Sequence, residues 1–283
     1  MIERLAIVGV GLLGGSLAKA ARTHAIAREI VGIGRDEGRL RPALTDGTLD
    51  RATTDLRDGL SGADRVVLAA TVLANETLLP AVWPAAAPGA VVTDVGSTKR
   101  GIVAVAERLA PGRRDVQFVG SHPMAGSEKA GYAVARGDLF QGATVVVTPA
   151  EFNTPGAVKS VGELWGAVGA RVVTLEPDAH DRAVAAISHL PHVVAWALVD
   201  AVARFEPDAF AVAARGFKDT TRIAASDPDV WREILLANRD AVVASVAAFR
   251  LALDDLERLV ARGDAAALTA LLARVKAQRE KLA

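Results

Sequence analysis

The stretch LAIVGVGLLGGSL at Leu5–Leu17 decides the fold. Its apolar start, Leu5–Val8, predicts a buried strand, and a GxGxxG turn follows directly and opens a helical pattern. In such a turn Gly9 permits the tight bend, Gly11 lets the backbone approach a pyrophosphate, and Gly14 allows the helix to pack closely on the strand. A glycine-rich turn alone is common, but the strand before it and the helix after it make the interpretation specific. The sequence predicts a dinucleotide site of the Rossmann type, with the cofactor held by Gly9, Gly11, Leu12, Leu13 and Gly14.

The first half of the chain alternates short β-branched runs with helical patterns. Strands are predicted at Leu5–Val8, Ile30–Ile33, Val66–Ala70 and Ala90–Thr93, and helices at Leu12–Arg22, Thr71–Ala81 and Lys99–Leu109. This order predicts βαβ units, a doubly wound parallel sheet and helices on both of its faces. Three further runs should extend the sheet: Val116–Val119, Thr144–Thr148 and Arg171–Thr174. A helix near Pro155–Val168 is predicted between the last two runs.

After Glu176-Pro177 the pattern changes to long helices rich in Ala, Leu and Val. No strand is predicted beyond Asp178, and helical spacing runs through His180–Arg204, Val230–Ala261 and Asp264–Leu282. We therefore expect a dinucleotide-binding domain over 1–177 and an all-helical substrate and dimerisation domain over 178–283. The broad apolar helix faces need a partner surface, and an intertwined homodimer would supply one. Packing on the first domain is the alternative.

Composition limits the function. The 283 residues suggest about two domains, at roughly 150 residues each. The chain has 33 basic and 33 acidic residues, and this zero net charge argues against nucleic acid or an anionic membrane as the main partner. It contains no cysteine, which excludes disulfides, thiolate catalysis and Cys-based metal sites and suits a reducing cytosol.

Targeting and membrane signals are weak. The N-terminal residues do not fit a signal peptide. No window offers the roughly 18 to 20 consecutive apolar residues of a membrane span. The apolar stretch Val193–Ala203 is interrupted by Asp200 and predicts a buried helix. We expect a soluble cytoplasmic protein.

The residue that would contact the adenosine ribose should end the second strand, about 20 residues after the glycines. That strand ends in Gly32-Ile33-Gly34-Arg35-Asp36. Arg35 suits a 2′-phosphate and favours NADP, whereas a register one residue different would bring Asp36 to the ribose hydroxyls and favour NAD. Both cofactors stay open, and Arg35 as a plain surface charge is the third interpretation.

Two polar loops follow predicted strands, at Asp94–Lys99 and at Gly120–Glu128. Ligands of doubly wound sheets bind at the carboxyl ends of the strands, so both loops are candidate site elements. His122 is the natural general base because the imidazole pKa lies near neutrality. Ser97 could orient or polarise that imidazole.

The helical half adds Ser188-His189-Leu190-Pro191-His192 and the charged segment Gly216–Arg222, which we expect to be a loop. His189 and His192 share one helix face. They carry no carboxylate at ligand spacing, so no metal site is predicted. Arg222 suits bidentate binding of a carboxylate, and Asp219 as a helix cap is the simpler alternative for this segment.

Together these strings resemble the prephenate/arogenate dehydrogenase family of tyrosine biosynthesis. The resemblance spans nearly the whole chain and rests on VGVGLLGGSL, DVGSTK at Asp94–Lys99, GSHPMAGSEKAG at Gly120–Gly131, ISHLPH at Ile187–His192 and GFKDTTRIAASDPDVW at Gly216–Trp231. It implies NAD(P)-dependent oxidation of a cyclohexadiene substrate with loss of carbon dioxide.

The resemblance also implies roles for single residues. His122 would accept the proton of the substrate hydroxyl, and Ser97 would hold the reacting geometry. Arg222 would bind a substrate carboxylate, with Asp219 orienting its segment. Two further residues fit the motifs: Glu128 would lie near the substrate side chain and Thr71 near the cofactor. Of the two histidines in the second motif, His192 is favoured over His189 for contact with the substrate.

Other functions are less well supported. A β-hydroxy acid dehydrogenase on the same plan would need a catalytic Lys from the second domain, and Lys218 is the only Lys between Lys159 and Lys276. A non-catalytic dinucleotide sensor would not need His122, Ser97 and Arg222. Between prephenate and arogenate the sequence leaves the choice open.

Overall fold

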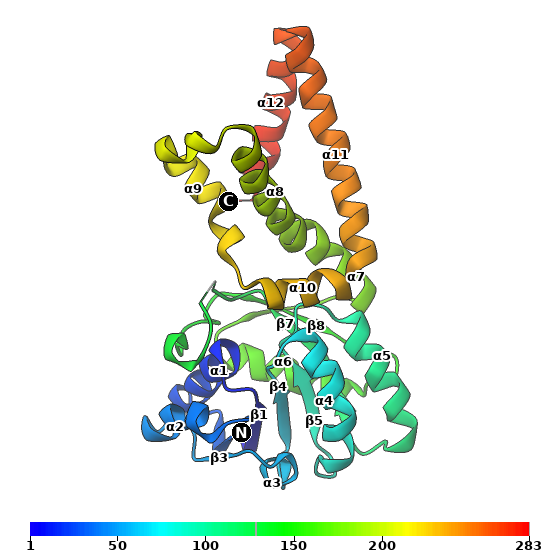
Figure 1. Ribbon diagram of the computed structural model, residues 1–283. Coiled ribbons are helices and arrows are strands. Elements are labelled where there is room, and N and C mark those ends of the chain that lie inside the picture. The colour runs from blue at the N-terminus through cyan, green and yellow to red at the C-terminus, as the bar shows by residue number, and fades with distance from the viewer. Residues whose placement is uncertain (128, 283) are drawn as a thin grey trace. The chain divides into compact units, whose positions relative to one another are not determined.

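A computed structural model describes residues 1–127 and 129–282 (Figure 1). The chain divides into two compact units, residues 1–238 and 239–283. The first contains both sheets and the helices around them. The second is a pair of helices.

The main sheet of the first unit is parallel and has six strands in the order β3-β2-β1-β4-β5-β6. The strands are β1 Ile2–Val8, β2 Ala27–Ile33, β3 Arg51–Thr53, β4 Arg65–Leu68, β5 Val91–Asp94 and β6 Gln117–Phe118. The chain order reverses between β1 and β4, where Val8 pairs with Leu68. This is the topological switch point at which such sheets bind ligands.

Helices cover both faces of the main sheet, because alternate residues of each strand point to opposite faces. From β1, Leu5 and Ile7 join a core that includes Trp165, whereas Ala6 and Val8 join a second core that includes Trp83. The helices are α1 Leu12–Thr23, α2 Glu37–Thr45, α3 Leu56–Leu60, α4 Val72–Ala85, α5 Arg100–Leu109 and α6 Pro155–Ala167. The predicted doubly wound sheet is confirmed.

A smaller sheet corrects one prediction. The runs at Thr144–Thr148 and Arg171–Thr174 do not extend the main sheet but form β8 and β9 of a separate sheet, with β7 Gly120–Pro123. β7 pairs antiparallel with β8, and β8 pairs parallel with β9. Among its described residues, the segment between β7 and β8 forms only the short turn η2 Tyr132–Val134, and an antiparallel pair needs no crossover helix, whereas a parallel one does.

The helical part of the first unit starts with α7 Pro177–Val184, the π-helical turn η3 Ala185–His189 and α8 Leu190–Phe205. It continues through η4 Pro207–Val212, α9 Arg215–Thr221, η5 Arg222–Ala225 and α10 Pro228–Ala237. The segment predicted as a charged loop is thus helical, and Arg215 and Asp219, one turn apart on α9, form an exposed ion pair at 3.3 Å.

Two further predictions about helices are wrong. The helix expected over Val230–Ala261 is interrupted at Asn238, a fully buried residue whose side-chain amide donates to the Asp181 carbonyl at 2.7 Å. The apolar pattern continues through this point and hides the break. The stretch Val193–Ala203, expected to be buried, contributes only Ala195 to the buried residues of α8.

One helical stretch among the described residues, Pro177–Phe205, is long and apolar enough to cross a membrane by length and composition alone. Its most apolar window has a mean hydropathy of 1.4 and is 22% buried. The stretch also contains the buried polar side chains of His180, Asp181 and His189. A single stretch of this kind is weak evidence for a membrane span.

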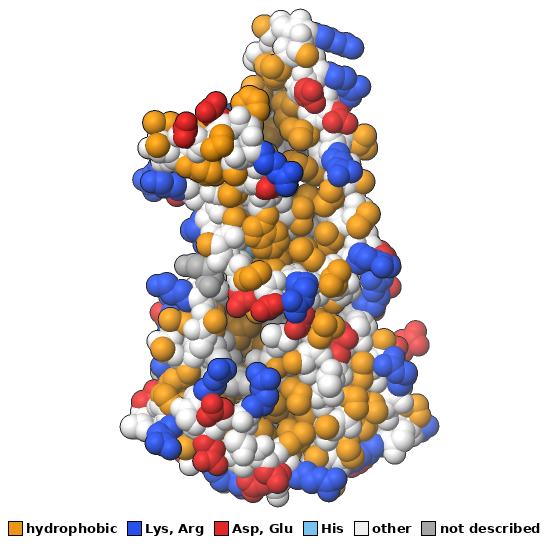
Figure 2. Space-filling model, viewed as in Figure 1, with side chains coloured by type: hydrophobic (Ala, Val, Ile, Leu, Met, Phe, Trp, Pro, Cys, Tyr) orange, Lys and Arg blue, Asp and Glu red, His pale blue; other side chains and the backbone are white. Residues whose placement is uncertain are grey.

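The second unit consists of α11 Arg239–Arg262 and α12 Ala265–Glu280. Gly263, with φ of +63°, makes the turn between them, and the Asp264 side chain accepts from the Ala267 N–H at 3.0 Å and caps α12. Figure 2 shows hydrophobic side chains along the visible face of α11. The exposed ones on this helix include Val243, Leu251, Leu253 and Val260.

Candidate active site

The glycine-rich turn joins β1 to α1 at the switch point of the main sheet. Gly9 has φ of +100°, and a Cβ there would lie 2.7 Å from the Ala69 carbonyl oxygen. A Cβ at Gly14 would lie 2.0 Å from the Gly9 oxygen, whereas one at Gly11 would meet nothing within 4 Å. The turn is therefore closed on its inner side and open at Gly11, where the first N–H groups of α1 are available to an anion. This geometry fits a dinucleotide pyrophosphate.

The predicted ribose position borders a cavity of about 410 Å³. Arg35 and Arg39 both line it, so two cations face this end of the site. Asp36 also lines it, but its carboxylate accepts from the Gly38 N–H at 2.7 Å and caps α2. β2 ends at Ile33, so Arg35 is the second residue after the strand and Asp36 is the third.

A second cavity, of about 360 Å³, lies on the other side of the glycine turn. It brings together five of the predicted site residues, and α10 and the segment after β7 supply further walls. The lining residues are Gly11, Leu12, Leu13, Ala69, Ala70, Thr71, Val72, Val95, Gly96, Ser97, Ser127, Lys129, Ala130, Gly131, Ser226, Asp227, Val230, Trp231 and Ile234. We call it the central cleft.

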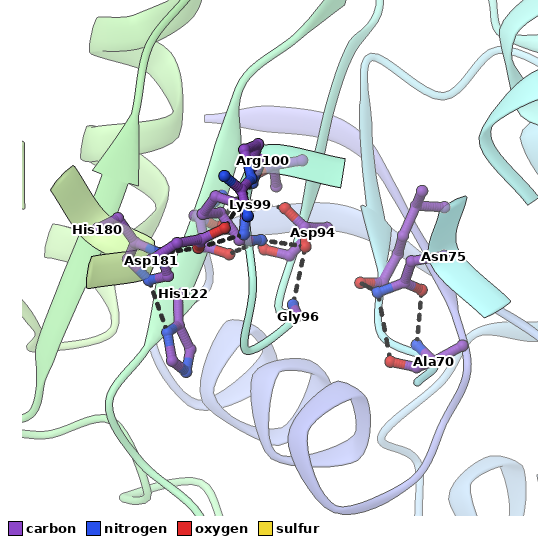
Figure 3. Close-up of polar contacts among 12 residues, drawn as sticks. Ala70, Asn75, Asp94, Gly96, Lys99, Arg100, His122, His180 and Asp181 are labelled. Atoms are coloured by element: carbon purple, nitrogen blue, oxygen red, sulfur yellow. Dashed lines mark hydrogen bonds and ion pairs between the residues drawn. The ribbon is translucent and has the colours of Figure 1, made fainter. Parts of the chain in front are cut away.

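Asn75 shapes the loop that brings Thr71 to the central cleft (Figure 3). This side chain of α4 is 1% exposed. Its oxygen accepts from the Ala70 N–H at 3.0 Å, and its nitrogen donates to the carbonyls of Leu68 and Ala70 at 3.3 Å. Sequence reasoning missed Asn75, because an Asn inside a helical pattern carries no signal of its own.

The loop with Ser97 is held by the buried ion pair of Lys99 and Asp94. Lys99 also donates to the Ser121 carbonyl at 2.8 Å, and Asp94 accepts from the N–H groups of Gly96 and Ser121 at 2.8 and 3.1 Å. Burial lowers the pKa of the Lys99 ammonium, although the Asp94 charge opposes this shift. The pair joins the β5 loop to β7, so Ser97 and His122 stand on one fixed scaffold. Within the described part of the chain, Ser97 makes no hydrogen bond to His122.

His122 lies in β7 rather than in the predicted loop, and it is 7% exposed. Its Nδ1 is 2.9 Å from Nε2 of His180, and Nδ1 of His180 is 2.8 Å from Oδ1 of Asp181 (Figure 3). Burial holds the pKa of His122 well below its usual 6.5, and the charge of Lys99 lowers it further. His122 is therefore neutral at pH 7 and able to accept a proton.

Asp181 ends this chain of hydrogen bonds at the N-terminus of α5. Burial alone would raise the pKa of its carboxyl, but hydrogen bonds from His180 and from the N–H groups of Arg100 and Lys99 lower it. Asp181 is thus ionised and accepts from His180. Sequence reasoning missed both His180 and Asp181; the available signal was a His-Asp pair in a chain that has only five histidines.

The histidines of the second motif separate into two environments. His192 stacks on Trp231 with ring centroids 3.5 Å apart, and burial and the Arg222 charge lower the pKa of its imidazole. His189 is fully buried beside Asn238, and burial lowers its pKa to about 4. His192 therefore lies near Arg222 and a wall of the central cleft. His189 belongs instead to the buried hydrogen-bond network that includes Asn238.

The remaining predicted residues are less informative. Asp219 is two-thirds exposed and pairs with Arg215. Glu128 lies outside the described residues. Among the residues that are described, no group of three or more His, Cys, Asp or Glu could hold a metal ion.

Tyr132 anchors the segment after β7 to the dinucleotide-binding helices. Its hydroxyl donates to the Asp46 carboxylate at 2.6 Å and lies 2.8 Å from Thr48 Oγ1, and burial and Asp46 raise its pKa to about 12. Nζ of Lys19 stands 4.5 Å from the centre of the ring. A Cβ at Gly15 would lie 2.6 Å from the ring, so α1 and the ring can meet only because residue 15 is glycine.

A Rossmann sheet with an open glycine turn at its switch point, together with a neutral imidazole bonded through a second imidazole to a carboxylate, defines a nicotinamide-dinucleotide-dependent dehydrogenase. Two family models match the chain: the nucleotide-binding domain of prephenate dehydrogenase over residues 17–174 and its dimerization domain over residues 176–274. The chain belongs to the prephenate dehydrogenase family, which confirms the resemblance drawn from the motifs.

Individual relatives agree. Prephenate dehydrogenase of Bacillus subtilis is 36% identical over 86% of this chain, which spans 66% of the length of that relative. Cyclohexadienyl dehydrogenase of Zymomonas mobilis is 30% identical over 93% of the chain and 90% of its own length. The crystal structure of Aquifex aeolicus prephenate dehydrogenase in complex with hydroxyphenyl propionate and NAD+ superposes with a TM-score of 0.93, at 34% identity, over 100% of this chain and 99% of that one.

Proposed function

We propose that this chain oxidises prephenate to 4-hydroxyphenylpyruvate and carbon dioxide with a nicotinamide dinucleotide as oxidant. The observation that carries the proposal is the neutral His122 at the end of the chain through His180 to Asp181. Family membership supplies the substrate class.

The residues present fit the cofactor. The open position at Gly11 and the first N–H groups of α1, at Leu12 and Leu13, would hold the pyrophosphate, and Thr71 would lie near the nicotinamide side. When bound, the dinucleotide supplies the hydride acceptor.

The hydrogen bonds define the tautomers that suit a general base. Ionised Asp181 accepts the Nδ1–H of His180, so Nε2 of His180 accepts the Nδ1–H of His122. Nε2 of His122 is then left with its lone pair. It takes the proton of the substrate hydroxyl as the adjacent carbon loses hydride, and Asp181 stabilises the resulting imidazolium through His180. Loss of the ring carboxylate as carbon dioxide leaves its bonding electrons in the ring, which becomes aromatic.

Substrate binding is assigned to residues around the central cleft. Arg222 would bind a carboxylate of the substrate, and His192, near it and stacked on Trp231, would contact the substrate beside it. Ser97 would hold the hydroxyl toward His122. The motifs also assign contacts or support to His189, Asp219 and Glu128.

For the cofactor we infer a preference for NADP. Arg35 and Arg39 line the cavity at the end of β2, and the nearby carboxylate of Asp36 is occupied in capping α2. Guanidinium groups suit the 2′-phosphate that distinguishes NADP from NAD.

The proposal is tested by a two-by-two assay of the purified chain, with prephenate or arogenate and with NAD or NADP. We expect turnover of prephenate, faster with NADP. Turnover of arogenate alone would show that arogenate, not prephenate, is the substrate. This outcome needs testing because arogenate and cyclohexadienyl dehydrogenases are among the relatives. Absence of turnover in all four combinations would overturn the proposal.

We also infer a cytoplasmic homodimer formed by the helical half, with a functional domain boundary near residue 177. In support, the dimerization-domain match starts at residue 176, and α11 and α12 expose apolar side chains that include Leu251 and Leu272. Light scattering on the purified chain should give twice its mass of 29.4 kDa. A mass of one chain at micromolar concentration would contradict the dimer.

A further inference from the structure

Helix α4 begins at the edge of the central cleft without a cap of its own. Its N-cap residue, Thr71, makes no side-chain capping bond, and its first turn has no acidic residue. The Leu73 N–H instead donates to Oε2 of Glu233 at 3.1 Å, across 160 positions of sequence. Glu233 belongs to α10, which lies against α4 (Figure 1). A carboxylate at this position also complements the positive end of the helix dipole.

The same helix α10 forms a wall of the central cleft. Asp227, Val230, Trp231 and Ile234 line the cleft, at a spacing that puts them on one side of the helix. Thr71 and Val72, at the start of α4, line it as well. Glu233 therefore joins two elements that border one cavity, at the point where they meet.

The far end of α10 is attached independently. Asn238, just after its last turn, donates to the Asp181 carbonyl at 2.7 Å and lies 3.2 Å from Nδ1 of His189. This end is buried, whereas the bond of Glu233 is exposed to solvent. Loss of that bond would free the α4 side of the helix while the Asn238 side stays in place.

We propose that Glu233 is a positioning residue that fastens α10 to α4 and so keeps the central cleft closed around the bound dinucleotide. The role rests on the proposed function of this cleft as the nicotinamide site. The Glu233 carboxylate touches no reacting atom. It acts through Trp231 and Val230, whose positions against the cleft depend on where α10 sits.

The proposal predicts an effect on affinity rather than on chemistry. If the closed arrangement is the one that binds, the apparent Kd for the dinucleotide rises by the factor by which its population falls. Glu233→Ala should therefore raise the Kd and KM for the dinucleotide about five- to tenfold, as expected for loss of a charged cap, with kcat changed less than twofold. Glu233→Gln keeps an oxygen that can accept the same N–H and should restore affinity to within about twofold of the unmodified chain.

The matched control is Asp229→Asn on the same helix. Asp229 is 80% exposed and, among the described residues, its carboxylate pairs only with Arg232 within its own turn, so its loss tests the stability of α10 without touching α4. Kd is measured by quenching of tryptophan fluorescence with NADP and with NAD, and KM and kcat by the rate of cofactor reduction. An unchanged Kd in Glu233→Ala, or an equal rise in Asp229→Asn, would overturn the proposal. Because the Kd needs no prephenate, failure of the proposed substrate would leave this result interpretable.

Discussion

Nδ1 of His122 lies 2.9 Å from Nε2 of His180, although the two residues are 58 positions apart and belong to a strand and to a helix of different parts of the fold. The contact fixes which nitrogen of His122 is free. It also links the base to Asp181, whose carboxylate is held by the N-terminus of α5.

His180→Ala removes the acceptor that orients His122. We expect kcat/KM to fall about 10- to 100-fold, the cost typical of losing a partner that orients a functional imidazole. The acidic limb of the pH profile, which should lie below pH 6.5 in the unmodified chain, should move further down, since the variant loses the hydrogen bond through which Asp181 stabilises the protonated His122. The profile of kcat/KM between pH 4.5 and 8 checks both effects, with the exposed His24→Ala as the control. A lower rate with an unmoved limb would indicate a purely structural role.

His122→Asn removes the base itself. Turnover should fall by about two to four orders of magnitude, the usual contribution of general base catalysis, while the Kd for the dinucleotide stays nearly unchanged. Steady-state rates and fluorescence titration separate the two quantities. Near-normal turnover in this variant would remove His122 from the mechanism.

Arg222→Ala should raise the KM for prephenate about 10- to 100-fold, the range expected for losing a charge-assisted hydrogen bond to a carboxylate. The KM for the dinucleotide should change little. Arg215→Ala is the matched control, because Arg215 is 93% exposed and lies one helix earlier in the chain. Equal KM values in the two variants would exclude Arg222 from substrate binding.

Arg35→Ala combined with Arg39→Ala should lower kcat/KM for NADP at least about tenfold and leave the value for NAD within about threefold. The ratio of the two values, measured at saturating prephenate, is the deciding quantity. If both values fall equally, these arginines support the fold of the cavity and do not select the cofactor.

The buried His189 makes stability depend on pH. Its pKa is about 4 in the folded chain against 6.5 when unfolded. Below pH 6.5 the His189 imidazole of the unfolded chain therefore binds a proton, whereas that of the folded chain does not bind one until the pH falls to about 4. The free energy of unfolding should fall by up to about 3 kcal/mol from this residue as the pH drops from 7 to 4. Urea unfolding at several pH values measures the slope, and His189→Phe should reduce it whereas His24→Ala should not.

Much of the first half could be predicted from sequence, because glycine spacing and β-branched runs are local signals. The turn at Gly9–Gly14 and five of the six strands of the main sheet, all except β3, depend on residues a few positions apart. The small sheet of β7, β8 and β9 could not be predicted, because a run such as Thr144–Thr148 has the same apolar pattern whichever sheet it joins.

The residues of the active site likewise divide into those that local sequence patterns predict and those that they do not. His122 and Ser97 stand in recognisable motifs, whereas His180, Asp181 and Asn238 acquire their roles only from contacts between distant segments. The break at Asn238 is a further case, since its buried amide bonds stop the helix while the apolar spacing runs on. Local patterns contain no information about such partners.

Because Gly15 lies against the Tyr132 ring, the residue type that each of these two distant positions can accept depends on the other. A side chain at residue 15 would meet that ring at 2.6 Å, so a larger residue there can be accepted only if position 132 becomes smaller. Losing the tyrosine would in turn release Asp46, Thr48 and Lys19 from the segment that follows β7. Along a lineage of such enzymes the two sites should change together or not at all.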